Sequence, residues 1–371
     1  MKKSTNTSTV KQTRQQRSMW GRVRTIGIDL GDRFSYFCAI DEAGETVFEG
    51  RVATTGGAFQ LQFGTIGPKT IAIETGTHSP WVSRLLSSLG HEVIVANSRK
   101  LRLIYENRTK SDRVDAEYLA RVARLDRKLL GEVRHRSETA QADLALLRSR
   151  DAIVAMRTRL INHVRGSVKS LGVRLPSSSS NGFRKNVVDA IPPFIRAVLL
   201  PLVDLVAQLT KQIKVFDRRA EQLIRDRYPQ AQRLLQVRGV GPITALAFIL
   251  TLEDHRRFPR SRSVGPFIGL VPAREDSGER RPQKRISKQG DPFLRRLLVG
   301  CAHYILGPFG TDCDLRRHGL TMAARGGKNA KKRAAVAVAR KLGVLLHRLW
   351  SSEVAYDPLF NAKQRQTVAA A

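Results

Sequence analysis

Thr25-Ile-Gly-Ile-Asp-Leu-Gly31 is the stretch that decides the fold. Its apolar run predicts a buried strand, and the glycine after Leu30 predicts a turn. A second apolar run, Thr70-Ile-Ala-Ile-Glu74, also ends in a carboxylate. Each run therefore predicts a strand that closes with an acidic side chain, Asp29 in the first and Glu74 in the second.

Two further acidic residues, Asp112 and Asp115, lie three residues apart on a predicted helix, so both project from one face. A cluster of carboxylates repels itself unless a cation neutralises it, and Mg²⁺ is the natural occupant because it prefers carboxylate oxygens. Each residue also has a purely structural interpretation: Asp29 as a turn cap, Glu74 as an ion-pair partner of an arginine, and Asp112 as a helix N-cap.

The charge of the chain indicates a polyanionic partner. Its 371 residues hold 65 Lys+Arg against 32 Asp+Glu, a formal net charge of +33. Such a field attracts nucleic acid, and together with the carboxylates it predicts an enzyme that cuts or rejoins nucleic acid. The alternatives are a basic nucleic-acid scaffold and a basic protein of the membrane surface.

Cysteine usage and hydropathy indicate a reducing, cytoplasmic setting with no membrane. Cys38, Cys301 and Cys313 have no metal-ligand spacing and are too few for a disulfide framework. The most apolar stretch, residues 187–209, is interrupted by prolines and by Arg196 and Asp204, which argues against a membrane span.

Residues 23–127 read as an α/β domain. Strands are expected at 23–30, 34–40, 45–52, 70–74 and 92–96, and helices at 58–66, 79–89 and up to residue 125. Three meandering strands followed by alternating helices and strands is the element order of the RNase H superfamily, although other α/β folds share parts of it.

Residues 128–233 read as a long helical hairpin. Leu146, Ile153 and Leu160 repeat every seven residues, with Met156 and Val164 on the same stripe. A second 4,3 spacing predicts a coiled-coil seam; its members are Leu202, Val206, Leu209, Ile213, Phe216, Ala220 and Leu223. The hairpin can pack on itself or on another subunit, and the regular seam favours a homo-oligomer.

Residues 234–350 read as a mainly helical domain with two candidate nucleic-acid elements. Gly239-Val-Gly241 resembles the turn of helix-hairpin-helix units, which presents amides to a phosphate, but it also suits a plain helix junction. Farther on, cations surround Ser277, a candidate nucleophile, with Ser287 in reserve; they are Arg274, Arg280, Arg281, Lys284, Arg285, Lys288, Arg295 and Arg296. A further basic run, residues 325–333, suits an RNA or phosphate clamp and equally a plain basic loop.

The motifs together resemble the DEDD transposases of insertion sequences, the IS-one-ten family that includes the Piv-type DNA invertases. The matching pieces occur in the family's order over most of residues 24–305. They read GIDLG, AIETG, SDRVDA, VRGVGPITA, RFPRSRSVGPFIGLVP, DSG and ISKQGDPFLRRLL. The basic arm is longer than the family needs, and Ser111 stands where Thr is common.

That resemblance implies a RuvC-like domain, a coiled-coil linker and a C-terminal domain with a catalytic serine. Asp29, Glu74, Asp112 and Asp115 would bind Mg²⁺, and Ser277 would attack DNA. The implied partners are target and donor DNA, a noncoding bridge RNA that guides the enzyme, and further copies of the chain in a dimer or tetramer.

The expected division of the chain is a disordered basic arm (1–22), a RuvC-like catalytic domain (23–127), a coiled-coil helical linker (128–233), a C-terminal serine transposase domain (234–350) and a tail (351–371). The competing enzyme is a Holliday-junction resolvase that uses the metal alone, without a serine intermediate.

Overall fold

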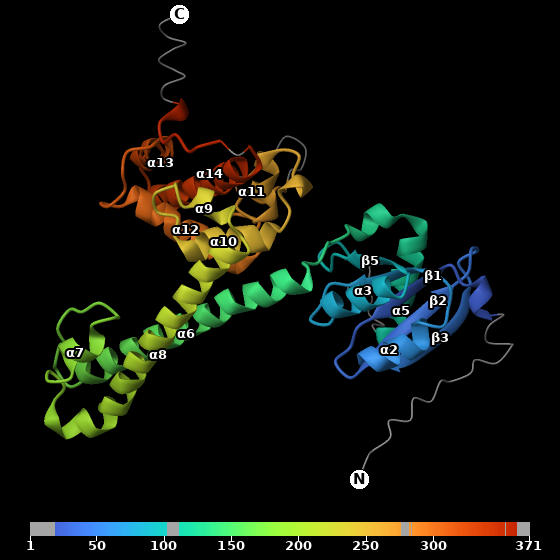
Figure 1. Ribbon diagram of the computed structural model, residues 1–371, viewed down its shortest axis with the longest axis horizontal. Helices are drawn as coiled ribbons and strands as arrows, with labels where there is room; N and C mark the ends of the chain where they lie inside the picture. The colour runs from blue at the N-terminus through green and yellow to red at the C-terminus, as the bar shows by residue number, and fades with distance from the viewer. Residues whose placement is uncertain (1–18, 102–110, 276–281, 283, 353, 362–371) are drawn as a thin grey trace, which may run out of the picture. The chain divides into compact units, whose positions relative to one another are not determined.

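A computed structural model describes residues 19–101, 111–275, 282, 284–352 and 354–361. The chain divides into two compact units, residues 1–136 and 137–371. The first unit contains all the described strands of the sheet, and the second is built mainly from helices (Figure 1).

A five-stranded sheet forms the first unit, in the order β3-β2-β1-β4-β5. β1, β2 and β3 are antiparallel, whereas β4 pairs in parallel with both β1 and β5. This arrangement fits the RNase H-like element order predicted above, and every predicted strand is present. The strands are β1 (Thr25–Asp29), β2 (Phe34–Ile40), β3 (Thr46–Ala53), β4 (Thr70–Glu74) and β5 (Glu92–Ala96).

The helices of this unit contribute to different clusters of buried residues. Ile26 and Ile28 share a core with Phe59 and Phe63 of α2 (Gly56–Phe63) and with α3 (Ser79–Ser88). The other face contacts α5 (Asp112–Leu125), which is followed by the short helix η1 (Arg127–Leu130). Because side chains alternate along a strand, Gly27 and Asp29 share the face that α5 covers.

The backbone of α5 lies directly on Gly27. A Cβ atom at this position would lie 2.1 Å from the Ala116 carbonyl oxygen and 2.4 Å from the Ala120 nitrogen. At the far end of the helix, Arg121 and Arg124 donate to the carbonyl oxygens of Gly44 and Glu42 in the β2–β3 turn. That turn lies at the start of β1, so the first turn of α5 lies at the end of β1, beside Asp29.

A buried histidine joins the second half of the sheet to α2. The Nδ1 atom of His91 accepts a hydrogen bond from the Lys69 backbone nitrogen at 3.2 Å. Nε2 therefore carries the ring proton and donates it to the Phe63 carbonyl oxygen at 3.0 Å. Burial lowers the pKa of His91, the hydrogen bond to Phe63 opposes that effect, and the charge of Lys69 adds to it.

Two long helices, α6 (Glu138–Lys169) and α8 (Pro193–Asp226), run side by side in the second unit, with α7 (Phe183–Val187) between them in the chain (Figure 1). Both long helices were predicted, but the seam on α8 was half wrong. Its buried residues are Leu199, Val203, Val206, Thr210, Ile213, Ala220 and Ile224. Val206, Ile213 and Ala220 are buried as predicted, but Val203, Thr210 and Ile224 are buried in place of Leu202, Leu209 and Leu223. On α6, the predicted Met156 is 51% exposed.

Polar side chains explain the shift, because they occupy the middle of the α6–α8 contact. Arg150 donates to Asp217 at 2.6 Å, and Arg157 donates to Thr210 at 3.3 Å. Hydrophobicity alone selects the neighbouring Leu209 and Phe216, which are only partly buried. Burial lowers the pKa of Arg157, and the nearby Arg150 charge adds to this effect.

The rest of the second unit packs around α10, whose residues from Thr244 to Leu252 are all buried. The same core includes the first turns of α6 and the last turns of α8. The central helix α10 spans Pro242–Leu252, and the helices around it are α9 (Ala231–Leu234), η2 (His255–Arg257), η3 (Ser261–Ser263), α11 (Val264–Phe267), α12 (Pro292–Leu306), α13 (Asp314–Ala324) and α14 (Ala330–Ser352).

Among the described residues, α8 alone is long and apolar enough to cross a membrane by length and composition. Its buried residues Leu199, Val203 and Val206 pack with Phe183 and Val187 of α7 and with Val164 of α6. The apolar character of α8 therefore serves at least in part to pack these helices together.

Replacing Gly27 by alanine should destabilise the first unit by about 1–3 kcal/mol, because the new methyl group meets the backbone of α5. Stability is measured by urea unfolding, followed by tryptophan fluorescence in a Trp350→Phe background. In that background the fluorescence reports on this unit, since the remaining tryptophans, Trp20 and Trp81, both lie in it. Gly57→Ala is the matched control, because nothing lies within 4 Å of its added Cβ. Equal stability of the two variants would contradict the packing argument.

Acidification should weaken the first unit through His91. The folded pKa lies below the usual value near 6.5, so the unfolded chain takes up a proton that the folded chain resists. Stability is therefore highest above that value and falls as the pH drops below it. Urea unfolding at about pH 7.5 and about pH 5.5 should show a smaller difference in His91→Gln than in the parent chain; an unchanged difference would exclude His91 as a cause.

Candidate functional site

Asp29 and Glu74 lie at the same edge of the sheet. β1 and β4 are parallel neighbours, and the two residues stand one position beyond the last pair in the register, Ile28 and Ile73. Ala72 pairs with Gly27 and packs with Leu119 of α5, so Glu74 lies on the α5 face as Asp29 does. Both carboxylates are partly buried.

The first turn of α5 adds the other two carboxylates. Ser111 is the N-cap and accepts a hydrogen bond from the Val114 nitrogen, so Asp112 is the first residue of the helix and not its cap. Asp115 is buried, with 7% of its surface exposed, and immediately precedes Ala116 on Gly27. Asp112 is exposed. The helix N-terminus also favours negative charge at this position.

The donor atoms suit a hard divalent cation, because all four candidate ligands are carboxylates. Within the described ranges, however, no three His, Cys, Asp or Glu side chains come close enough together to hold a metal ion. The backbone thus brings the ends of β1 and β4 and the first turn of α5 to one edge, but the four side chains do not form a metal-binding cluster.

Histidines that the sequence interpretation did not single out flank this edge. His78 lies 3.6 Å from Asp32 and accepts a hydrogen bond from the Trp81 indole at 3.1 Å. The buried Ser79 hydroxyl contacts Nε2 of His135 at 2.8 Å and bonds both backbone groups of Gly76. These contacts fix the loop that follows Glu74. For His78 and Ser79 the only signal in the sequence was their closeness to AIETG, whereas His135 is distant in the chain and gave none.

The basic segment of the second unit runs from Gly269 to Gly290. Its two ends lie close together. Gly269 has a φ of +70°, and a Cβ there would lie 2.6 Å from the Gln289 nitrogen. Backbone hydrogen bonds of an antiparallel pair join the two sides of the segment: the Ala273 nitrogen donates to the Arg285 oxygen, and the Ser287 nitrogen donates to the Val271 oxygen. Ser277, Arg280 and Arg281 lie outside the described residues. The exposed cations of the described part are Arg274, Lys284, Arg285 and Lys288, of which Lys284 pairs with Glu275.

Ser287, the reserve nucleophile, has a buried hydroxyl oxygen with no hydrogen-bond partner in the described part of the chain. A nucleophile must reach its substrate, so this burial argues against Ser287 in the conformation seen.

Arg295 and Arg296 are engaged within the protein. Arg295 donates to the carbonyl oxygens of Ile268 and Gly290, each at 3.1 Å, and so holds the base of the segment closed. Arg296 pairs with Asp151 of α6 and lies over the Phe293 ring at 5.7 Å. Both predicted nucleic-acid ligands thus have a structural role in this state.

The Gly239-Val-Gly241 turn lies between α9 and α10. Gly239 has a φ of +97°, which favours glycine, and a Cβ there would lie 2.8 Å from the Tyr304 ring. Gly241 is the N-cap of α10 and has no side chain to cap the helix. The turn stands at the start of α10, where backbone amides suit a phosphate.

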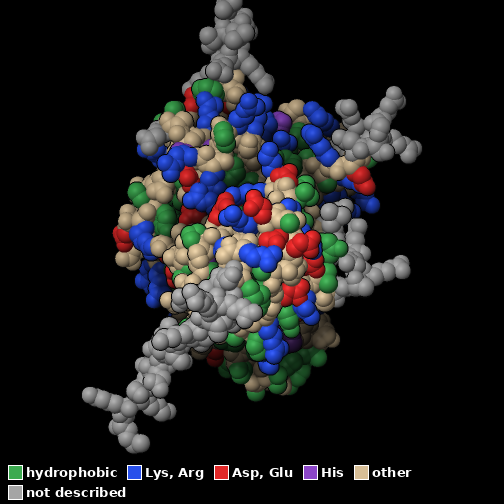
Figure 2. All heavy atoms as spheres, turned by 90° about the vertical axis from the view of Figure 1, so that its right-hand side faces the viewer, with side chains coloured by type: hydrophobic (Ala, Val, Ile, Leu, Met, Phe, Trp, Pro, Cys, Tyr) green, Lys and Arg blue, Asp and Glu red, His purple; other side chains and the backbone are tan. Residues whose placement is uncertain are grey.

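Basic side chains extend over the surface of both units. Figure 2 shows Lys and Arg spread across the face in view, with Asp and Glu among them. Arg325 and Lys328 between α13 and α14 are exposed, and so are Lys331, Lys332 and Arg333 in the first turn of α14. The 94 residues from 255 to 348 hold 22 Lys+Arg against 6 Asp+Glu, so the charge of this part is strongly one-sided.

Two family models match the chain. A DEDD transposase model of the IS110 group covers residues 26–172, and the "Transposase IS116/IS110/IS902 family" model covers residues 231–308. The first match includes all four candidate carboxylates. The second includes the Gly239 turn and the basic segment with Ser277.

Curated transposases are similar over most of their length. The transposase of insertion sequence IS1328 from Yersinia enterocolitica is 32% identical over 285 residues, covering 76% of this chain and 83% of that protein. The transposase of IS1111A from Coxiella burnetii is 26% identical over 341 residues, covering 90% and 91%. A probable family 20 transposase from Pseudomonas aeruginosa is 29% identical over 307 residues, covering 80% and 88%.

Matches of this extent, on the motifs that build both candidate centres, show that the chain belongs to the IS116/IS110/IS902 family of insertion-sequence transposases.

Proposed function

We propose that this transposase cuts and rejoins DNA through a serine nucleophile and a Mg²⁺ site formed by Asp29, Glu74, Asp112 and Asp115, guided by a noncoding bridge RNA. The observation that supports it most is the backbone placement of the four acidic residues, at the ends of β1 and β4 and in the first turn of α5, near one edge of the sheet.

The metal site is supported by the chemistry of its ligands and by the backbone that holds them. A carboxylate as buried as Asp115 is costly to keep charged without a neighbouring cation. Bound there, Mg²⁺ would neutralise part of the charge of the scissile phosphate. The loop contacts of Ser79 and His135 would keep Glu74 in place beside it.

In the proposed reaction, the Ser277 hydroxyl attacks a DNA phosphate. A serine–phosphate bond forms, the bond to the 3′ oxygen breaks, and that oxygen leaves as a free hydroxyl. After strand exchange, the 3′ hydroxyl of the other duplex attacks the phosphoserine and releases the serine. One phosphoester replaces another in each step, so the reaction needs no ATP.

The proposed partners are two DNA duplexes, the guide RNA and further copies of the chain. The net charge of +33 supports binding of several polyanions at once. For the oligomer, we propose that the α6–α8 pair acts as a coiled-coil element. Phe194 and Val198 of α8 are 75% and 67% exposed, which leaves apolar surface for a second copy.

The competing function is a metal-dependent resolvase without a serine intermediate. It uses the same four carboxylates and needs no serine nucleophile, and it agrees with the buried hydroxyl of the reserve candidate, Ser287. The two functions differ in whether a covalent protein–DNA adduct forms.

Asp29→Asn, Glu74→Gln and Asp115→Asn should each lower DNA strand cleavage at least about a hundredfold, because a lost metal ligand costs several kcal/mol of charge stabilisation. Titration calorimetry with Mg²⁺ should show the loss of binding independently of cleavage. Glu42→Gln is the control, since its side chain is exposed in the β2–β3 turn at the opposite end of β1. Cleavage at the parent rate in all three variants would rule out the quartet.

Ser277→Ala should abolish a protein–DNA adduct that survives denaturation, whereas Ser287→Ala should keep it. The measurement combines protein, Mg²⁺, the element's flanking noncoding RNA and a labelled target–donor DNA pair on a denaturing gel. Leaving out the RNA should also remove the adduct. If Ser277→Ala still cuts DNA normally while Asp29→Asn does not, the resolvase function is correct instead.

A further inference from the structure

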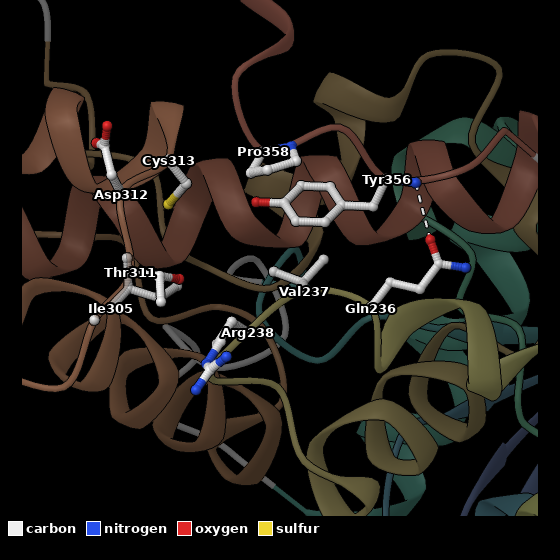
Figure 3. A pocket seen from close by; sticks show the side chains of 10 residues that line it. Gln236, Val237, Arg238, Ile305, Thr311, Asp312, Cys313, Tyr356 and Pro358 are labelled. Carbon is white, nitrogen blue, oxygen red and sulfur yellow. Dashed lines mark hydrogen bonds between the residues drawn. The ribbon is translucent and has the colours of Figure 1, made fainter.

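A cavity of about 360 Å³ opens beside the Gly239 turn. Three separate parts of the second unit line it: residues 236–238, the stretch from Ile305 to Cys313, and the segment that holds Tyr356 and Pro358. In Figure 3 the Tyr356 ring and Pro358 lie above, and Arg238 and Thr311 lie below. Its volume falls in the range of about 300–1,000 Å³ that small-molecule sites occupy.

The wall that carries Tyr356 is held in place by hydrogen bonds. The Tyr356 nitrogen donates to Gln236 Oε1 at 2.9 Å, as the dashed line in Figure 3 marks. The Asp314 nitrogen donates to the Pro358 carbonyl oxygen at 2.8 Å, and Asn361 donates twice to the Asp314 carboxylate. An aromatic ring is therefore presented to the cavity by a fixed backbone.

The charge balance of the cavity favours an anion. Asp312 is engaged by Arg317 through three hydrogen bonds of 2.5 to 3.1 Å, so its negative charge is neutralised. Arg238 is exposed, and within the described residues no hydrogen bond or ion pair engages its guanidinium. Arg238 directly precedes Gly239, so an anion bound by its side chain would lie beside the turn whose amides suit a phosphate.

An exposed aromatic side chain adjoins the cavity. Phe309 is 75% exposed and directly precedes Gly310, one of the lining residues. The loop that carries Phe309 is held in place by Arg316, which donates to the carbonyl oxygens of Ile305 and Gly307, each at 2.6 Å. A Cβ at Gly310 would lie 2.0 Å from the Ile305 oxygen. The Phe309 side chain therefore stays available to a ligand beside the cavity.

We propose that this cavity holds a single unpaired nucleotide of a bound nucleic acid, its base against Tyr356 and Phe309 and its phosphate at Arg238. Stacking on aromatic rings and cationic contacts to the backbone are the common features of sites for unpaired nucleotides. The Thr311 hydroxyl and the Gln236 amide nitrogen supply polar groups for a base edge. A duplex is too wide for a cavity of this size, which selects an extruded or single-stranded base.

The site extends the proposed function to a specific recognition element, and it depends on that function only in requiring a nucleic-acid ligand. It does not involve the carboxylates or Ser277. The nucleotide can belong to a DNA strand or to an RNA, because both offer a phosphate and a base.

Binding is measured by fluorescence with two pairs of probes: a DNA duplex with one extrahelical 2-aminopurine beside its fully paired counterpart, and an RNA hairpin with one bulged 2-aminopurine beside its paired counterpart. The full-length chain should bind at least one bulged probe about fivefold or more tightly than its paired counterpart, the lower end of what one stacked base contributes.

Phe309→Ala and Arg238→Ala should each reduce that preference, and Phe309→Tyr should keep it. Arg238→Ala should also lower the slope of log affinity against log salt by about 1 for the bulged probe. Leu125→Ala and Arg218→Ala are matched controls, because they remove an exposed apolar side chain of α5 and an exposed arginine of α8. Thermal unfolding checks that each variant is folded.

A preference confined to the DNA pair identifies a DNA nucleotide, and one confined to the RNA pair identifies an RNA nucleotide. Equal binding of bulged and paired probes overturns the proposal, as does a preference that survives both Phe309→Ala and Arg238→Ala. A chain that still forms the Ser277-dependent adduct but shows no such preference loses only the nucleotide site. A chain with the preference and no adduct loses only the serine mechanism.

Discussion

The close contact between α5 and the backbone of Gly27 controls the geometry of the first unit. Only a residue without a side chain lets the Ala116 carbonyl lie against β1, because a Cβ would stand 2.1 Å from that oxygen. The same contact sets the height of the helix above the sheet and brings its first turn to the end of β1. Asp115 is buried there as a consequence, next to the edge that carries Asp29 and Glu74. Packing of a glycine therefore decides where the first turn of α5, with Asp112 and Asp115, lies relative to the ends of β1 and β4.

The second unit separates its apolar and cationic residues sharply. α10 is buried along nearly its whole length and organises a core to which α6, α8, α12 and α14 all contribute. Some arginines of this unit are used internally, as Arg295 and Arg316 bind carbonyl oxygens where the chain turns. Others, including Arg238 and the cations of residues 325–333, remain exposed. Net charge alone does not distinguish these two uses, whereas hydrogen-bond partners do.

Local pattern was sufficient for the strands: β2 and β5 begin and end at the predicted residues, since apolar runs bounded by turns are read from neighbours in sequence. The seam of α8 was read half wrongly, because Thr210 and Asp217 are polar and hydrophobicity selects Leu209 and Phe216 instead. The roles of Gly27, His91 and Arg295 were not predictable, since each depends on a partner distant in the chain. The candidate carboxylates were identified correctly as strand ends and helix start, but their approach at one edge needed the register of β1 and β4.

The polar contacts in the middle of the α6–α8 pair, Arg150 with Asp217 and Arg157 with Thr210, affect how the stability of the pair is distributed. On one side of Arg150 and Asp217 the helices belong to the core of α10, and on the other side they pack with α7 in a separate apolar cluster. Stability in such an arrangement is divided, because each cluster can open without the other. The end of the hairpin that carries α7 is thus an independent cooperative segment, and its amide protons should exchange with solvent at a rate of their own. A shift of one helix by a turn would leave Asp217 without Arg150, so these polar contacts also fix the register of the two helices.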